Sequence, residues 1–367
     1  MPQAAPTAAR DDLERSDELF AKGVALHQAG DIIGAIDAYE QALEVKPWRL
    51  DARSNLGAAF VRLGRFDEAV EQYRKALETD SGSVPVRFNL GLALYKSGRI
   101  EEAAAEFKGT LDRDPSQQAA LLLLADCLLQ MGNDRQVIDL LSPHEDALGD
   151  DRLFAYLLGT ALIHEDELRH GQILIDRLFR GGESAEGHLL LGVQHLGRED
   201  SRLAVPELRR AAELNPELPT VHSMLGVALM NNGERAEAIT EFRRELERNP
   251  NDFQANLRLG LLLREENRLD TALDYMRRAG RVRPRDPDVL YGLGRIYVGR
   301  DDLESAEATL QELTEATPGF EPGHVLLANV YYRRGKRELG DQARATVERL
   351  RAERKAREGP SGAESDR

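Results

Sequence analysis

The stretch from His164 to His170 holds the residue types best suited to metal chemistry. It reads His-Glu-Asp-Glu-Leu-Arg-His, and metalloproteases use histidine and glutamate to bind zinc and activate water. A zinc-binding helix needs two histidines four residues apart, whereas His164 and His170 are six apart. This spacing favours a polar turn, so we expect no metal site here.

The other reactive side chains have no partners at a catalytic spacing. Cys127 is the single cysteine and lies in the apolar stretch 121–129, without a cationic neighbour in sequence to lower the pKa of its thiol. We therefore predict a buried structural thiol, with no intrachain disulfide and no cysteine-built zinc site. No glycine-rich loop follows a strand, and nothing places serine, histidine and aspartate as a triad. We predict no catalytic residues, no cofactor and no enzymatic activity.

The charge of the chain disfavours nucleic acid as a partner. The 367 residues carry a formal net charge of -15, and binding to phosphates depends on neutralisation by lysine and arginine. Acidic membrane surfaces are disfavoured too, and no stretch approaches the roughly 18 apolar residues of a membrane span. We expect a cytoplasmic protein from the chain as given; removal of a signal peptide would leave a periplasmic or secreted location open. Arginine outnumbers lysine, which is typical of a GC-rich bacterial genome.

Small residues recur along the chain at a fixed spacing. This spacing indicates which structural elements carry the side chains considered above. The spacing is 34 residues at every step except one of 33, between Gly159 and Gly192. Such a period predicts one supersecondary unit that is copied and stacked. The members of this small-residue column are Gly23, Gly57, Gly91, Ala125, Gly159, Gly192, Gly226, Gly260, Gly294 and Ala328.

Alignment on this column, taken as position 8, predicts two amphipathic helices in each repeat. Leucine at position 7 and a large residue at position 11 share one helix face, as do a small residue at 20 and a large one at 24. Between them, position 15 is glycine, aspartate, asparagine or glutamate, which predicts a left-handed turn. Position 24 is filled by Tyr39, Tyr73, Phe107, Leu141, Ile175, Leu208, Phe242, Met276 and Leu310.

These columns resemble the tetratricopeptide repeat over nearly the whole chain, in about ten copies. One repeat matches the family pattern at Leu56-Gly57, Phe60, Gly64, Ala69, Tyr73 and Ala76, and another at Leu225-Gly226, Leu229, Gly233, Ala238, Phe242 and Pro250. The resemblance implies an all-α fold, a right-handed superhelical solenoid of antiparallel helix pairs.

Departures from the pattern divide the chain. Ser142-Pro143-His144 interrupts the second helix of the fourth repeat, residues 146–151 are expected to form a loop, and Gly181-Gly182 precedes the 33-residue step. We expect a change of twist or a hinge in this degenerate region. The predicted divisions are a disordered or helical extension (1–15), repeats 1–4 (16–141), the degenerate region (142–187), repeats 6–10 (188–339), a capping helix (340–358) and a disordered tail (359–367).

In the family, first helices line a concave groove, and the resemblance implies that positions 2, 5, 9, 12 and 13 face it. Apolar and aromatic side chains at exposed positions are typical of a binding surface. The alternative is that some of them, above all at position 9, pack against the next helix pair. The residues predicted to bind a partner are Phe88, Tyr95, Leu122, Asp126, Leu129, Tyr156, Ile163, Leu189, Met230, Leu257, Arg264, Tyr291, Arg295, Asn329 and Tyr332.

The clamp with which some family members hold a terminal carboxylate is absent from the first repeats. Asn55 and Asn89 match it, but its cationic positions are occupied by Phe20 or Ser54 and by Pro85 or Ala119. We therefore predict a non-enzymatic scaffold that binds an unidentified protein or peptide in an apolar groove. The alternative is a regulatory or targeting subunit of a separately encoded glycosyltransferase or peptidase.

Overall fold

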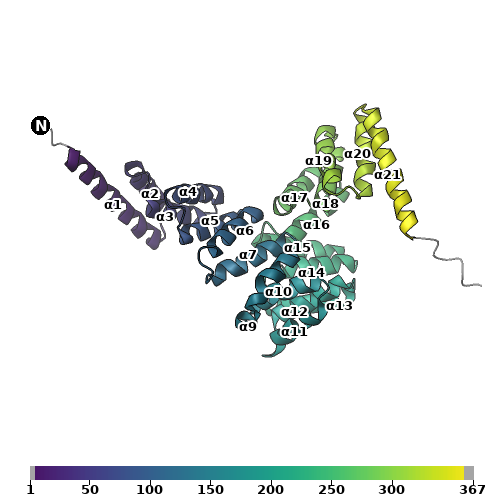
Figure 1. The fold of residues 1–367 in the computed structure, drawn as a ribbon, viewed down its shortest axis with the longest axis horizontal. Helices are drawn as coiled ribbons and strands as arrows, with labels where there is room; N and C mark the ends of the chain where they lie inside the picture. The colour runs from purple at the N-terminus through teal and green to yellow at the C-terminus, as the bar shows by residue number, and fades with distance from the viewer. Residues whose placement is uncertain (1–4, 359–367) are drawn as a thin grey trace, which may run out of the picture. The chain divides into compact units, whose positions relative to one another are not determined.

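The structure, a computed structural model, describes the backbone of residues 5–358 and the side chains of residues 12–356 (Figure 1). All regular secondary structure in this range is helical. The chain divides into two compact units, Met1–Gly182 and Glu183–Arg367. The predicted N-terminal extension is helical from Ala5 onwards, and the predicted tail, 359–367, lies outside the described residues.

The first unit is a stack of helices in which the two helices of a repeat pack against each other and the second helix packs against the next repeat. A helix and its successor form one repeat, and the first helices of neighbouring repeats also contact each other. The helices are α1 (Ala5–Ala29), α2 (Ile32–Val45), α3 (Leu50–Arg62), α4 (Phe66–Thr79), α5 (Val84–Lys96), α6 (Ile100–Leu111), α7 (Gln118–Gln130), α8 (Asp134–Leu141), the 3-10 turn η1 (Ser142–His144), α9 (Glu145–Leu148), α10 (Arg152–His164) and α11 (Leu168–Phe179).

The second unit repeats this arrangement without interruption. Its first helices, α12, α14, α16, α18 and α20, contact one another in sequence as well as their own second helices. The helices are α12 (Ala185–Gly197), α13 (Ser201–Leu214), α14 (Val221–Asn231), α15 (Arg235–Arg248), α16 (Phe253–Glu265), α17 (Leu269–Val282), α18 (Pro287–Gly299), α19 (Leu303–Ala316), α20 (Glu321–Arg333) and α21 (Arg337–Glu358).

Glycine at position 8 allows the two helices of a repeat to approach closely. The large side chain at position 24 lies directly over this glycine: a β-carbon on Gly57 would stand 2.8 Å from the ring of Tyr73, and one on Gly91 2.7 Å from that of Phe107. The rings of Tyr73 and Phe107 are themselves fully buried. The two columns found in the sequence are therefore the two sides of one close helix contact.

The left-handed residue that the sequence predicts for most turns between paired helices is present at position 15 of all ten repeats. Glycine fills six of these positions, with φ between 71° and 87°, as at Gly64 and Gly233. Asp166, Glu199, Asn267 and Asp301 adopt φ between 58° and 60° instead. The amide that follows bonds back to the helix, as Arg65 N does to Phe60 O at 2.9 Å. This bond satisfies a carbonyl that the helix end would otherwise leave free.

The second helix of the fourth repeat is broken where the sequence predicts it. Helix α8 ends at Leu141, and η1 contains Pro143, whose ring is incompatible with a helix interior. The expectation of a loop from residue 146 is wrong for 146–148, which belong to α9. Glu145, at the start of α9, pairs with His170 and Arg177 of α11, both at 2.8 Å. These ion pairs hold the short helix against its neighbour.

The predicted all-α stack of antiparallel helix pairs is thus confirmed within each unit. None of the described helices combines the length and the apolar character that crossing a bilayer requires.

Candidate partner-binding surface

The residues predicted to bind a partner all lie on first helices. In the first unit they belong to α5, α7 and α10, and in the second to α12, α14, α16, α18 and α20. Each unit therefore carries its own set of predicted positions.

Five of the predicted residues are buried, so the expectation that they face solvent is wrong. The side chains of Leu122, Tyr156, Ile163, Leu189 and Leu257 are each at most 9% exposed. Four of these five occupy position 5, as does the fully buried Ser223. In these repeats position 5 is a packing position, whereas Phe88 and Tyr291 at the same position keep exposed area.

Helix α10 shows why sequence periodicity overestimated the exposed surface. Its residues 154–163 are all buried, and it packs against α7, α8 and α11 of its own unit. A helix with apolar residues all round belongs in an interior. The run from Phe154 to Ile163 contains only Tyr156 and Thr160 as polar types, and this signal could have been recognised in the sequence.

Two predicted anchors of the first unit bond to each other. The hydroxyl of Tyr95 on α5 donates to Asp126 Oδ2 on α7 at 2.5 Å, and Gln130 Nε2 donates to the same carboxylate at 2.7 Å. Burial raises the pKa of Asp126, while the bonds from Tyr95 and Gln130 oppose that rise. Burial raises the pKa of Tyr95 as well, and the adjacent carboxylate adds to the effect. This network links the third and fourth repeats.

Several other predicted residues keep exposed area, and three of them also contact a neighbouring side chain of the protein. Phe88 packs against Phe107 with ring centroids 5.8 Å apart, and Tyr291 meets the ring of Phe320 edge-on at 5.4 Å. Leu129 and Met230 are half-buried, and Asn329 is exposed. Tyr332 is 39% exposed and donates to Asp341 of α21 at 2.7 Å.

Arg264 and Arg295 form the strongest positive feature among the predicted residues. The side chain of Arg264, on α16, is only 13% exposed, and its Nε is buried without a hydrogen-bond partner. Arg295, on α18, is exposed and places its guanidinium 5.7 Å from the ring centroid of Tyr291. Burial and the nearby charge of Arg295 lower the pKa of Arg264. Two cations from neighbouring repeats thus lie close together.

Sequence reasoning missed a buried acidic pair in the second unit. The amide N–H of Ser223 donates to Glu245 Oε2 at 3.4 Å, and the hydroxyl of Ser223 donates to Asp252 Oδ2 at 3.3 Å. Asp252 also accepts the N–H of Ala255 at 2.7 Å and so caps α16. Burial, together with the charge of Glu245, raises the pKa of Asp252 to about 7. No pattern in the sequence shows that Asp252 is buried.

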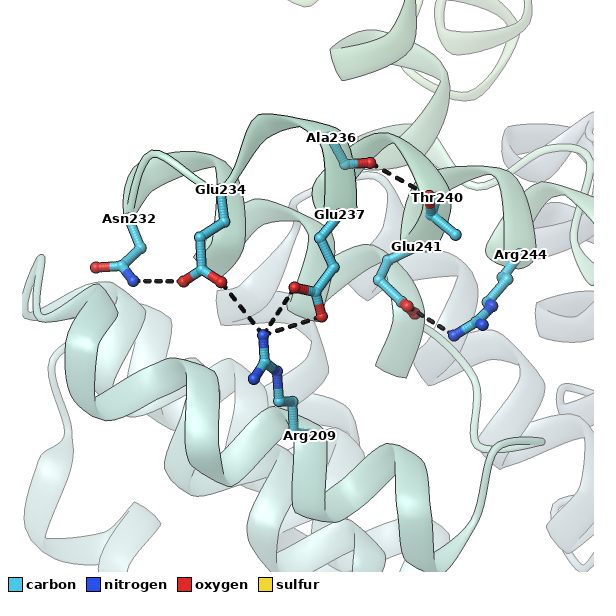
Figure 2. Close-up of polar contacts among 8 residues, drawn as sticks. All are labelled: Arg209, Asn232, Glu234, Ala236, Glu237, Thr240, Glu241 and Arg244. Atoms are coloured by element: carbon cyan, nitrogen blue, oxygen red, sulfur yellow. Dashed lines mark hydrogen bonds and ion pairs between the residues drawn. The ribbon is translucent and has the colours of Figure 1, made fainter.

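A second missed feature is an open pocket of about 400 Å³ lined by residues of α13, α14 and α15, several of them charged. Figure 2 shows Arg209 between Glu234 and Glu237, with N···O distances of 3.3 and 2.9 Å, and Arg244 beside Glu241 at 2.7 Å. Glu241 also binds Nδ1 of the buried His222 at 2.6 Å. These mutual pairs hold α13, α14 and α15 together.

The residues first considered for chemistry are separated in the structure. His164 binds Asp134 and His170 binds Glu145, each at 2.8 Å. Cys127 is fully buried, as expected, and burial raises the pKa of its thiol. Among the described residues, no three His, Cys, Asp or Glu side chains are grouped so that they could hold a metal ion.

Three family models match the chain, each described as a tetratricopeptide repeat or TPR repeat. One matches residues 94–160 and 263–330, a second 189–253 and 223–281, and a third 23–64 and 59–98. Together they span residues 23–160 and 189–330. No curated protein sequence matches the chain.

Solved structures similar to this chain include three of MamA. The MamA RS-1 ArsTM double mutant is 24% identical, with a TM-score of 0.43, and the match covers 48% of this chain and 98% of that one. MamA from residue 41 to its end, from Desulfovibrio magneticus RS-1, is 24% identical, with a TM-score of 0.42 and coverages of 49% and 99%. A further crystal structure of MamA is 18% identical, with a TM-score of 0.40 and coverages of 45% and 96%.

Proposed function

This chain belongs to the tetratricopeptide-repeat family, and on that premise we propose that it is a non-enzymatic scaffold that binds an extended or helical segment of a partner protein. The proposed binding site is a strip of partly exposed side chains on three consecutive first helices of the second unit. We name it the α14–α18 surface; it consists of Val227, Met230, Leu261, Arg264, Tyr291 and Arg295.

The observation that supports this proposal most directly is the combination of apolar side chains with two cations, of which Arg295 has no ion pair among the described residues and Arg264 has only a long one, to Glu265 at 3.7 Å. Val227, Met230 and Leu261 are half-buried, so each keeps apolar area that a partner could cover. Removing apolar area from water contributes roughly 25 cal/mol per Å². The two arginines add directional contacts that a purely apolar strip would lack.

The strip is continuous across neighbouring repeats. Helix α14 contacts α16, and α16 contacts α18. The side chain of Leu261 reaches α18, where a β-carbon on Gly292 would stand 3.7 Å from its Cδ2. Tyr291, the residue before Gly292, packs against Phe320, and the guanidinium of Arg295 lies over its ring. An aromatic side chain that is fixed in this way loses little conformational freedom when a partner binds.

Affinity capture from native lysate tests the proposal. The variant Val227→Glu/Met230→Glu places two carboxylates on the surface, and we expect it to lose the protein that the unchanged chain captures. Leu203→Glu is the matched control, because Leu203 is 51% exposed on the second helix α13 of the same unit. Circular dichroism should show equal helix content for all three proteins. Capture of the same protein by the double variant would contradict the proposal.

A further inference from the structure

Arg264 has no carboxylate of its own among the described residues. The nearest is Glu265, at 3.7 Å from Nη2, which is longer than a hydrogen bond. Glu265 also pairs with Arg235 of α15 at 3.0 Å. The guanidinium of Arg264 is nevertheless largely withdrawn from water, with its Nε buried and unpaired. A cation in this position is costly unless something compensates its charge.

Arg295 adds to the positive charge and does not compensate it. In the described part of the chain Arg295 has no ion-pair partner, and its contact is with the face of Tyr291. Burial lowers the pKa of Arg264, and the charge of the nearby Arg295 lowers it further. Other arginines that join neighbouring repeats have carboxylates, as Arg333 has Asp301 at 2.7 Å and Arg300 has Asp270. The pair on the α14–α18 surface departs from that pattern.

We propose that Arg264 and Arg295 together bind a side-chain carboxylate of the partner segment, so that this scaffold selects a segment with an acidic residue flanked by apolar ones. This inference rests on the proposed function. Guanidinium groups form strong charge-assisted hydrogen bonds with carboxylates, often two at a time. The apolar neighbours Leu261 and Met230 would bind the residues beside the acidic one.

The negative net charge of the chain restricts the recognition of an acidic residue to the immediate surroundings of the two arginines. At a net charge of -15 the protein repels acidic partners at long range, and that repulsion is screened beyond about 8 Å at physiological salt. An acidic residue is therefore favoured only where two cations meet it directly. The selected segment should carry an acidic residue at one position, and an acidic residue elsewhere in it should not help binding.

Selection from a displayed library of random 15-residue peptides tests the inference without a known partner. The full chain is the bait, and we expect the enriched peptides to share one Asp or Glu between apolar residues. For a synthetic peptide of that sequence, Arg264→Met and Arg295→Gln should each weaken binding about tenfold or more. Replacing the acidic residue of the peptide by its amide should weaken binding by the same factor. The amide peptide should then bind the arginine variants and the unchanged chain with equal affinity.

Two further variants separate recognition from structure. Arg281→Gln, on the second helix α17, removes an exposed arginine of the same unit and should leave peptide binding unchanged. Arg264→Met keeps the long side-chain stem but removes the uncompensated charge, so it should raise the melting temperature of the free protein while it weakens peptide binding. If Arg264 had only a structural role, Arg264→Met would lower both the melting temperature and the affinity for the peptide.

The outcomes distinguish the two proposals. Selected peptides that lose binding to Val227→Glu/Met230→Glu, but bind the arginine variants as tightly as the unchanged chain, would overturn this inference and leave the proposed function standing. Failure to select any peptide sensitive to the double glutamate variant would count against both.

Discussion

The ring of Phe242 lies against Gly226 so closely that a β-carbon on that glycine would stand 2.6 Å from the ring. Phe242 is fully buried, and Gly226 belongs to the first helix of the same repeat. The contact joins α14 to α15 within a single helix pair. The same relationship recurs between Gly23 and Tyr39 at the start of the chain.

Replacing Gly226 by alanine should destabilise the second unit although alanine is the better helix former. Overpacking of a close contact costs about 1–3 kcal/mol in the free energy of unfolding, which exceeds the gain of up to about 1 kcal/mol in helix propensity. Gly197→Ala is the control, because a β-carbon there would meet nothing within 4 Å and the residue ends helix α12. Urea unfolding followed by circular dichroism measures both. Equal stability of the two variants would show that the contact at Gly226 relaxes freely.

Replacing Tyr156 by alanine should lower the stability of the first unit severely. The side chain is 4% exposed, and removal of a buried aromatic ring costs about 3–5 kcal/mol. Ile173→Ala, at a side chain 48% exposed on α11, should cost much less. Thermal unfolding compares the two. A melting temperature for the Tyr156 variant close to that of the unchanged chain would contradict the burial described above.

The acidic pair around Ser223 should make the second unit less stable as the pH rises through neutrality. The pKa of Asp252 is raised from 3.8 to about 7, so between these values the folded state binds more protons than the unfolded state. The resulting stability is complete below about pH 4 and is lost as the pH rises to about 7. The groups facing Asp252 are Glu245, Arg283 and the hydroxyl of Ser223, and His222 acts on Glu245.

The variant Asp252→Asn isolates this contribution, because asparagine also caps helices well. The difference in the free energy of unfolding between the variant and the unchanged chain should change between pH 4 and pH 7 and level off above it. Denaturant unfolding in a series of buffers measures this difference. A difference that stays constant across that range would mean that Asp252 keeps its ordinary pKa.

The hinge expected in residues 142–187 remains a prediction. The boundary between the compact units, after Gly182, falls inside this range, and Gly182 has a φ of 113°. A protease site inserted between Gly181 and Gly182 should be cut under native conditions, and both products should keep their helix content. An uncut protein, or products that lose their helices, would mean that this segment is an integral part of one stack.

The repeat itself could be predicted almost completely from the sequence. The 34-residue period, the small residue at position 8 and the left-handed turn all follow from one alignment of columns. Glu199 shows how far the column extends: glutamate rarely adopts positive φ, yet Glu199 has the same left-handed conformation as the glycines at this position of the other repeats.

The binding surface could be predicted only in part, because helical periodicity does not separate a face covered by the next repeat from one that meets solvent. Tyr156 and Leu189 fit the same pattern as Met230, but only Met230 keeps exposed area. The bond between Tyr95 and Asp126 joins residues 31 positions apart, and no spacing rule identifies such a pair. Arg264 and Arg295 were each expected in the groove, whereas their proximity to each other and the pairing of Arg235 with Glu265 were visible only in three dimensions.

The close contact between positions 8 and 24 also constrains the order in which substitutions at these two positions can occur during evolution. A large side chain at position 24 must be lost or shortened before the opposing glycine can become alanine, since the reverse order passes through an overpacked intermediate. In the fourth repeat Ala125 already stands at position 8, opposite Leu141 at position 24. Each helix pair can thus diverge at its own rate while its neighbours keep the ancestral contact.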